Sequence, residues 1–246
     1  MGNKGHFDEF GTYLLAPIRI SDSLVRGYYA GITCTQTAPL NVTIGLAESY
    51  DDGTTFQKIG VGPVFSHAPH DPFVVSSQKI RRYNDKYYLF YTSGTEWLKN
   101  SNGYEPIYKL KVAVSDDGIS WVRSKEYLIE DKLETEAQAC PDVFYYEGGY
   151  HMFFCYRGCQ DYRKNVQNSY KIGYAYSDDL MNWTRDDNQI DINTSVNKAD
   201  FDYEMVAYPH VFELDGKLYM LYVGNEVGRY GFGLSELEFV RWNGLN

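Results

Sequence analysis

Three runs of aromatic and apolar residues follow one another in the middle of the chain, each bounded by turn residues. They cover residues 136–146, 150–156 and 170–177, and a fourth run can begin at Trp183. Each has the length of a strand and is rich in the aromatic and β-branched residues that favour strands. The Glu-Gly-Gly segment at 147–149 supplies glycines for a tight reversal of the chain. The pattern predicts a four-stranded antiparallel meander.

The same unit recurs before and after this central stretch. The second strand of the unit, an aromatic-rich motif at 87–91, returns at 150–154 and again at 218–222, so the spacing is 63 and then 68 residues. A turn that begins with serine and continues with aspartate follows the third strand at Ser49, Ser115 and Ser177. A proline opens each predicted first strand, at Pro72, Pro141 and Pro209. A repeat of this length is typical of stacked supersecondary units.

Four strands per repeat predict an all-β fold, a β-propeller, in which sheets stack radially and cover one another's faces. We expect a single domain over residues 1–246, because propellers of this size commonly form one domain. About four blades are present in this chain, and the expected blade boundaries are 13–59, 69–123, 138–185 and 209–242.

The amino-acid composition indicates which kinds of binding partner suit this protein. Aromatic residues make up 17% of the chain, with 24 Tyr, which suits stacked sheets and a sugar-binding surface. The net charge of −10 disfavours nucleic acid and anionic membrane surfaces, since both need clustered Lys and Arg. The four cysteines lack the spacing of a zinc site, so we expect reduced thiols. The absence of a leader-like or membrane-length apolar run in these residues predicts a soluble, cytoplasmic protein.

Two motifs carry a resemblance to a known group of enzymes. His70-Asp71-Pro72 and Cys140-Pro141-Asp142, together with the Ser-x-Asp-Gly turns, resemble the five-bladed propellers of glycoside hydrolase families 32, 43, 62, 68 and 130. The segments at 94–97, 151–157 and 224–233 are more similar to uncharacterised bacterial glycosidase-like proteins linked with surface-polysaccharide genes. The resemblance covers nearly the whole chain and implies a five-bladed-type propeller that lacks an N-terminal blade.

The missing blade leads to a further expectation. Each blade is a thin sheet whose faces are covered only by its neighbours, so an absent blade exposes apolar faces or unpaired strand edges. The sequence therefore predicts self-association of this chain, or marginal stability, if a blade is missing.

The resemblance also implies catalytic carboxylates, which face each other across a sugar in glycosidases. Asp71 stands where these propellers carry the acidic residue of an Arg-Asp-Pro motif, although an aspartate before proline also suits a simple turn. The family's usual acid is absent, because Ala139 occupies its position. Glu136 and Glu204 lie in matching Glu-x-x-Ala-x-Pro frames. If the blades converge on an axis, this pair can act as acid and base; the alternative is two solvated loop glutamates.

Further side chains near the predicted channel mouth are candidates for holding the substrate. An aromatic plane beside amides and guanidinium groups is one way to bind a pyranose, and arginine can also bind an anionic sugar. Structural packing or capping is the alternative for the histidines and for Trp97. The candidate substrate-binding residues are Asp8, His70, Glu96, Trp97, Asp142, Tyr156, Arg157, Arg163, Asp202, His210, Asn225 and Glu226.

Two functions from different classes follow. The first is a glycoside hydrolase acting on a microbial oligo- or polysaccharide by carboxylate acid/base chemistry, with Asp71, Glu136 and Glu204 as catalytic residues. The second is a non-catalytic sugar-binding propeller that serves polysaccharide biosynthesis, which Ala139 favours. Neither requires a cofactor or a metal site, although analogy with the family leaves room for a calcium ion in the channel. Similarity of fold cannot choose between them.

Overall fold

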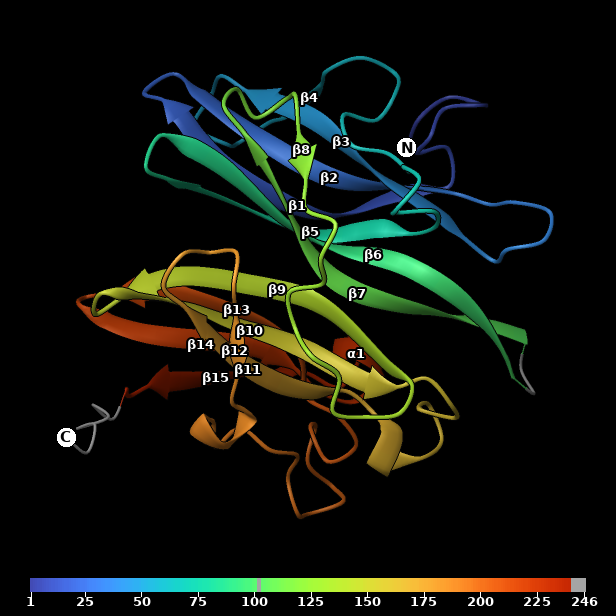
Figure 1. Cartoon of the computed structure of the whole chain (residues 1–246), viewed down its shortest axis with the longest axis vertical. Helices are drawn as coiled ribbons and strands as arrows, with labels where there is room; N and C mark the ends of the chain where they lie inside the picture. The colour runs from blue at the N-terminus through green and yellow to red at the C-terminus, as the bar shows by residue number, and fades with distance from the viewer. Residues whose placement is uncertain (101–102, 240–246) are drawn as a thin grey trace.

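The four predicted blades are four antiparallel sheets in a computed structural model that describes residues 1–100 and 103–239. Figure 1 shows them stacked from the blue first sheet through the green and yellow sheets to the orange and red fourth. Residues 240–242 of the last predicted blade lie outside the described residues. The fold is therefore an all-β propeller with four blades, as the repeat predicted.

Every sheet is a meander whose strands pair in chain order. The first contains β1 (Gly11–Ser21), β2 (Leu24–Thr33), β3 (Asn41–Ser49) and β4 (Gln57–Lys58). The second contains β5 (Val75–Tyr83), β6 (Lys86–Asn100), β7 (Gly103–Ser115) and β8 (Val122–Arg123). The third contains β9 (Glu136–Tyr146), β10 (Gly149–Gly158), β11 (Lys171–Ser177) and β12 (Thr184–Arg185). The fourth contains β13 (Ala207–Leu214), β14 (Lys217–Val223) and β15 (Phe232–Leu237).

Helical structure is confined to short connections in the described residues. Two 3-10 helices lie at Val166–Asn168 and Asp187–Gln189, and a one-turn segment, α1, covers Asn225–Gly228. None of these is long or apolar enough to cross a membrane.

The serine–aspartate segments form the tight turns that the sequence predicted. In the second sheet, Ser115 Oγ accepts the backbone N–H of Gly118 at 2.9 Å. Asp117 then accepts the N–H groups of Ile119 and Ser120, both at 2.7 Å. The same arrangement follows β11, where Asp179 accepts the N–H groups of Met181 and Asn182. These side chains satisfy backbone donors that a tight reversal would otherwise leave unpaired.

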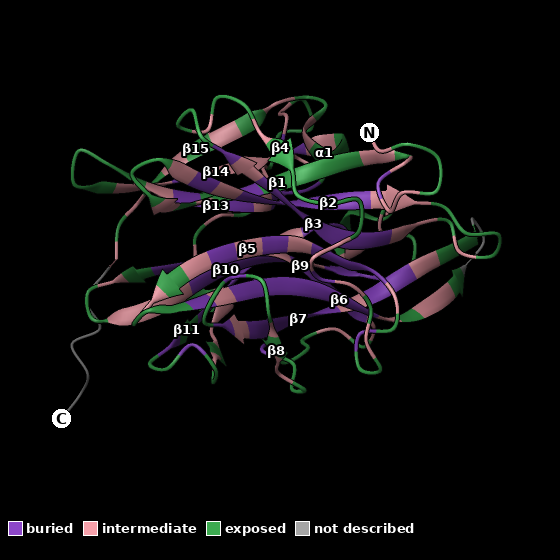
Figure 2. Ribbon diagram, turned by 90° about the horizontal axis from the view of Figure 1, so that it is seen from above, coloured by how far each residue is buried: buried purple, intermediate pink, exposed green. Residues whose placement is uncertain are grey.

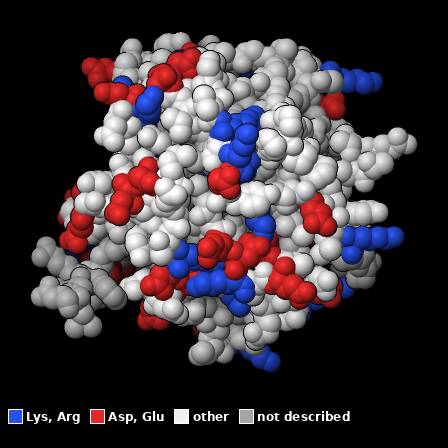
Figure 3. Space-filling model, in the orientation of Figure 1, with Lys and Arg blue, Asp and Glu red and all other residues white. Residues whose placement is uncertain are grey.

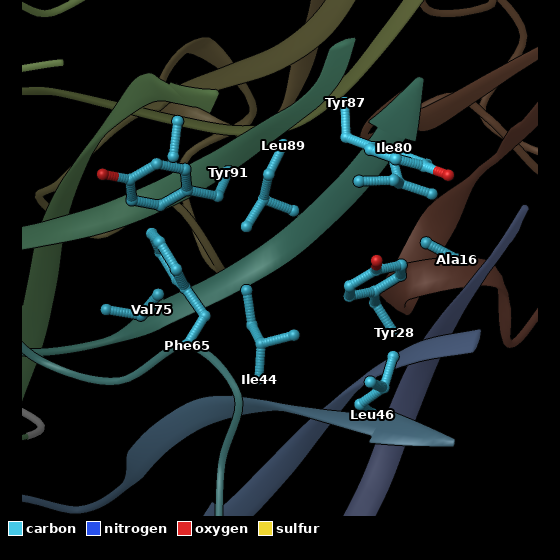
Figure 4. Packing of buried hydrophobic residues seen from close by; sticks show 11 residues of the cluster. Ala16, Tyr28, Ile44, Leu46, Phe65, Val75, Ile80, Tyr87, Leu89 and Tyr91 are labelled. Carbon is cyan, nitrogen blue, oxygen red and sulfur yellow. The ribbon is translucent and has the colours of Figure 1, made fainter. Parts of the chain in front are cut away.

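Apolar side chains between neighbouring sheets form the core. Ile44 of β3 and Phe65 pack against Leu89 and Tyr91 of β6, and all four are at most 2% exposed. Figure 4 shows these residues meeting between the first and second sheets. A second cluster joins the second and third sheets, and a third joins the third and fourth. In Figure 2 the buried residues accordingly lie along the strands, whereas the connecting loops are exposed.

The first strand of each blade carries a bulge. The prediction that a proline opens each first strand was wrong. Pro141 and Pro209 lie inside β9 and β13 rather than at their starts. In both strands the pairing register shifts at the proline, so its missing N–H removes no ladder hydrogen bond. One residue of each bulge adopts a left-handed conformation, with φ between 51° and 55°: Leu14, Ser77, Cys140 and Tyr208.

Candidate functional site

The four left-handed residues meet at the axis of the propeller. They line a cavity of about 840 Å³, and they also line a second cavity of about 310 Å³ that lies among the first strands. The larger space, called here the axial cavity, is bounded by the first strands and by loops at one end of the blades. Its wall at the axis consists of Tyr13, Leu14, Ser76, Ser77, Ala139, Cys140 and Tyr208. No carboxylate belongs to this inner wall.

The charged side chains that line the axial cavity come from outside the first strands. Three glutamates line it: Glu105 lies in β7, Glu204 precedes β13, and Glu226 lies in α1. The cations that line it are Arg157, Arg163 and Lys164. Glu105 forms an ion pair with Arg163, so this carboxylate is already neutralised.

Of the three predicted catalytic carboxylates, only Glu204 lines the axial cavity. A joint catalytic role of Asp71, Glu136 and Glu204 requires that all three line one cavity, and Asp71 and Glu136 do not line this one. Asp71 is fully buried beside Lys111 and Arg123, at 3.0 and 2.7 Å. Glu136 is also fully buried, and Arg185 of β12 donates to it at 2.7 Å. Both carboxylates hold the blade together from within.

The environment of Asp71 recurs in three blades. In each of them an aspartate lies six residues before the left-handed residue and accepts a hydrogen bond from the hydroxyl group of a tyrosine on the second strand. The pairs are Asp8 with Tyr29 (3.4 Å), Asp71 with Tyr91 (3.2 Å) and Asp202 with Tyr222 (3.1 Å). The third blade has Phe154 at the tyrosine position and no aspartate at the corresponding one. A contact repeated in this way belongs to the architecture of the blade.

Asp142 plays a similar part between blades. Its carboxylate accepts from Lys79 at 2.8 Å and from Arg81 at 3.0 Å, both on β5. On the other side it contacts the His210 ring at 3.0 Å and accepts the backbone N–H of Val211 at 2.8 Å, both on β13. This one carboxylate therefore connects the first strands of three blades. Asp142 and His210 line the second cavity and not the axial one.

The pKa values of these buried carboxylates reflect their partners. Burial by itself raises the pKa of Asp71, but hydrogen bonds from Ser93, Arg123 and Lys111 outweigh it and hold the pKa below the usual range. Burial likewise opposes ionisation of Asp142, and its contacts with His210 and Lys79 lower its pKa below that of a free aspartate. Both groups are therefore more acidic in the folded protein than in the unfolded chain.

A pH dependence of stability follows from these shifts. A carboxylate whose pKa is lowered by folding contributes stability above the pKa of the unfolded chain, about 3.9 for aspartate. We expect the melting temperature to fall as the pH drops from about 5 through the lowered pKa values of Asp71 and Asp142. Thermal unfolding followed by circular dichroism between pH 7 and pH 3 measures this. A double variant, Asp71→Asn with Asp142→Asn, that kept the slope of the wild type would assign the acid sensitivity to other groups.

The remaining predicted binding residues divide into two sets. Arg157, Arg163 and Glu226 line the axial cavity. The others do not line it. Asp8 forms an ion pair with Lys58, Asp202 accepts a hydrogen bond from Ser195, and Asn225 accepts the backbone N–H of Glu204. Trp97 packs against the cluster of Ala30, Val42 and Val74, Tyr156 lines a separate small cavity, and His70 and Glu96 are exposed. Sequence reasoning missed Tyr108, Tyr162, Tyr170 and Tyr208, which line the axial cavity. Among these, Tyr208 could have been identified from the sequence, because it lies 68 residues after Cys140 and so occupies the equivalent position of the next repeat.

Glu204 and Glu226 lie on two loops of the fourth sheet that are tied together. Glu204 precedes β13, and Glu226 lies in α1 after β14. Asn225 Oδ1 accepts the backbone N–H of Glu204 at 2.7 Å, and the Asn225 N–H donates to Phe201 O at 2.6 Å. Glu226 and Val227 have φ values of 50° and 60°, and a left-handed conformation is costly for a β-branched residue such as valine. Strain of this kind clusters at functional sites.

Glu136 and Glu204 occupy matching sequence frames but differ because of the fourth strand of their blades. In the third blade, β12 carries Arg185, which pairs with Glu136. The described part of the fourth blade contains three strands and supplies no such arginine to Glu204. Glu204 therefore remains exposed at the cavity, whereas Glu136 is enclosed. Within the described residues, no group of three or more His, Cys, Asp and Glu side chains is placed to hold a metal ion.

Comparison with known proteins gives relatives without an assigned activity and structures with the same fold. No family model matches the chain. It is 31% identical over 240 residues to two uncharacterised proteins of Mycobacterium tuberculosis, from strains CDC 1551 / Oshkosh and H37Rv, and the match covers 96% of this chain and 75% of each relative.

The similar solved structures include three glycoside hydrolases. The first has a TM-score of 0.72, 19% identity and coverage of 98% of this chain and 73% of the other. A thermostable family-43 glycoside hydrolase has a TM-score of 0.70, 16% identity and coverage of 94% and 72%. The Bombyx mori GH32 β-fructofuranosidase has a TM-score of 0.66, 20% identity and coverage of 93% and 48%. At these identities the likeness shows a shared fold.

Proposed function

The chain belongs to one family with the two uncharacterised Mycobacterium tuberculosis proteins, and we propose that it binds a saccharide in its axial cavity. The observation that carries the proposal is the cavity itself: about 840 Å³, on the axis, with tyrosine rings beside hydroxyl and charged groups. Sites for small molecules combine apolar and aromatic walls with a few convergent polar groups. The fold shared with glycoside hydrolases supports a saccharide over other small polar ligands.

The test of saccharide binding uses one lining residue and one matched residue elsewhere. Tyr208 lines the axial cavity, whereas Tyr176 of β11 is exposed and does not. A saccharide found by screening an oligosaccharide array should bind the Tyr208→Ala variant roughly three- to ten-fold more weakly, because one aromatic contact is lost. Isothermal titration calorimetry measures the affinity, and Tyr176→Ala should bind as the wild type does. Equal affinities for all three proteins would place the saccharide outside the axial cavity.

Hydrolysis of the bound saccharide is a second candidate function, and the pair Glu204 and Glu226 favours it. Glycosidases use two carboxyl groups, one to protonate the leaving oxygen and one to activate water or attack the sugar. These two glutamates line the axial cavity from loops that Asn225 joins. Arg229 contacts the Glu226 carboxylate at 2.8 Å. One of the two would serve as the proton donor and the other as the base or nucleophile.

The hydrolytic function predicts large effects of two conservative substitutions. If product analysis with natural oligosaccharides shows cleavage by the wild type, Glu204→Gln and Glu226→Gln should each lower kcat at least about 100-fold, the usual contribution of a positioned acid or base. Glu126→Gln, at an exposed position away from the axial cavity, is the control and should keep full activity. A saccharide that binds the wild type but is never cleaved would leave binding as the function.

A further inference from the structure

Arg157 is a buried cation whose partners are all neutral. It lies in β10, is 1% exposed and lines the axial cavity. Its guanidinium group donates to Tyr170 Oη at 3.2 Å and to Tyr108 Oη at 3.1 Å, and otherwise to two backbone carbonyls. The ring of Tyr162 stacks on it, with 3.8 Å from the guanidinium carbon to the ring centroid. Among the described residues, no carboxylate lies within ion-pair distance of Arg157.

The other buried cations of this protein are treated differently. Lys111 pairs with Asp71 at 3.0 Å, Lys79 with Asp142 at 2.8 Å, and Arg185 with Glu136 at 2.7 Å. Each of these cations has a carboxylate to offset the cost of its burial, which is several kcal/mol for an unpaired ion. Aromatic faces offset only part of that cost for Arg157. It is therefore the one cation of this group whose counter-charge the described chain does not supply.

The distribution of charge around the axial cavity suggests where that counter-charge comes from. The wall formed by residues 157–170 presents Arg157, Arg163 and Lys164 to the cavity, and Glu105 neutralises Arg163. The glutamates at 204 and 226 approach from the loops of the fourth sheet instead. On the face of the molecule in Figure 3, by contrast, acidic and basic side chains are interspersed. The lining of the cavity therefore carries cations on residues 157–164 and glutamates on the loops of the fourth sheet.

We propose that the saccharide bound in the axial cavity is acidic, with a carboxylate or phosphate group that faces Arg157 and the hydroxyl groups of Tyr108 and Tyr170. These two hydroxyls lie 3.0 Å apart and both contact the guanidinium group, so they can turn their protons toward an anion. Glu204 and Glu226 then face the uncharged hydroxyl groups of the sugar, where their own charge does not oppose binding. This inference rests on the proposed function, because it names the class of saccharide that the cavity binds.

The test compares matched ligands on the wild-type protein and so does not depend on the folding of a variant. The probes are uronic-acid oligosaccharides with their neutral methyl esters, and sugar phosphates with the corresponding unphosphorylated sugars. The acidic member of at least one pair should bind about ten-fold or more tightly, since a hydrogen bond to a charged group is stronger than one to a neutral group. Preference for the uronate or for the phosphate identifies the source of the charge.

Two variants locate the preference. Arg157→Lys keeps the charge but loses the planar fork, so it should reduce the ratio of acidic to neutral affinity several-fold. Arg82→Gln removes an exposed arginine that does not line the axial cavity, and it should leave that ratio unchanged. Melting temperatures confirm that both variants are folded. Saccharides that bind equally well with and without the anionic group would overturn the inference and leave the proposed function standing, whereas no binding of any probe would overturn both.

Discussion

Replacement of Asp71 by alanine is expected to lower the free energy of unfolding by about 3–5 kcal/mol, the usual cost of removing one partner from a buried ion pair. Asp71 is 0% exposed and accepts from Lys111, Arg123 and Ser93. Its loss leaves Lys111, itself 1% exposed, as a buried charge without a carboxylate. Urea denaturation followed by tryptophan fluorescence measures the change.

The matched control is an ion pair on the surface. Asp116 contacts Lys86 at 2.7 Å, but both side chains are more than half exposed, so Asp116→Ala should cost at most about 1 kcal/mol. The comparison also separates structure from catalysis at Asp71. A stable Asp71→Ala protein that binds saccharide but has lost hydrolysis would contradict the structural role of Asp71 and indicate a catalytic one.

Replacement of Leu89 by alanine is expected to cost about 2–5 kcal/mol, which is the range for removing a leucine side chain from a packed core. Leu89 is 0% exposed and lies between the first and second sheets, among Ile44, Tyr91 and Ile80 (Figure 4). Because each sheet depends on its neighbour to cover its face, the cavity left at Leu89 weakens both blades. Urea denaturation gives the free energy.

Val122, which is 76% exposed in β8 of the same blade, provides the control for this core substitution. Val122→Ala should change the free energy of unfolding by no more than about 0.5 kcal/mol. The two sheets should also lose their structure in one transition when Leu89 is replaced. Separate transitions for the first and second blades would show that the interface between them is not what holds them together.

The blades could be predicted because their signals are local. Strand-length aromatic runs, glycine reversals and Ser-Asp turns act over a few residues, and the structure places the strands of the third blade at Glu136–Tyr146, Gly149–Gly158, Lys171–Ser177 and Thr184–Arg185, close to the predicted runs. The position of the prolines could not be predicted, because a bulge depends on pairing between strands. Sequence spacing alone does not reveal where that pairing shifts.

The candidate site was predicted only in part, for a related reason. A carboxylate beside a first strand can face the axis or the interior of its blade, and the sequence frame around Glu136 and Glu204 is the same in both. Which environment each one meets depends on a residue far away in the chain. Asp8, Asp71 and Asp202 were candidates for the site, but each accepts a hydrogen bond from a tyrosine on the second strand of its blade and is therefore part of the blade structure.

The sequence by itself therefore determined the sheets, their order and their turns, since these depend on the alternation of side chains and on the conformations that glycine and aspartate favour. Only the tertiary structure decided which carboxylates are enclosed and which remain available. Arg185 of β12 encloses Glu136, while Glu204 lines the axial cavity with Arg157 and Glu226. The physical reason is that a charge is held by its partners in space, and those partners come from different strands and different blades.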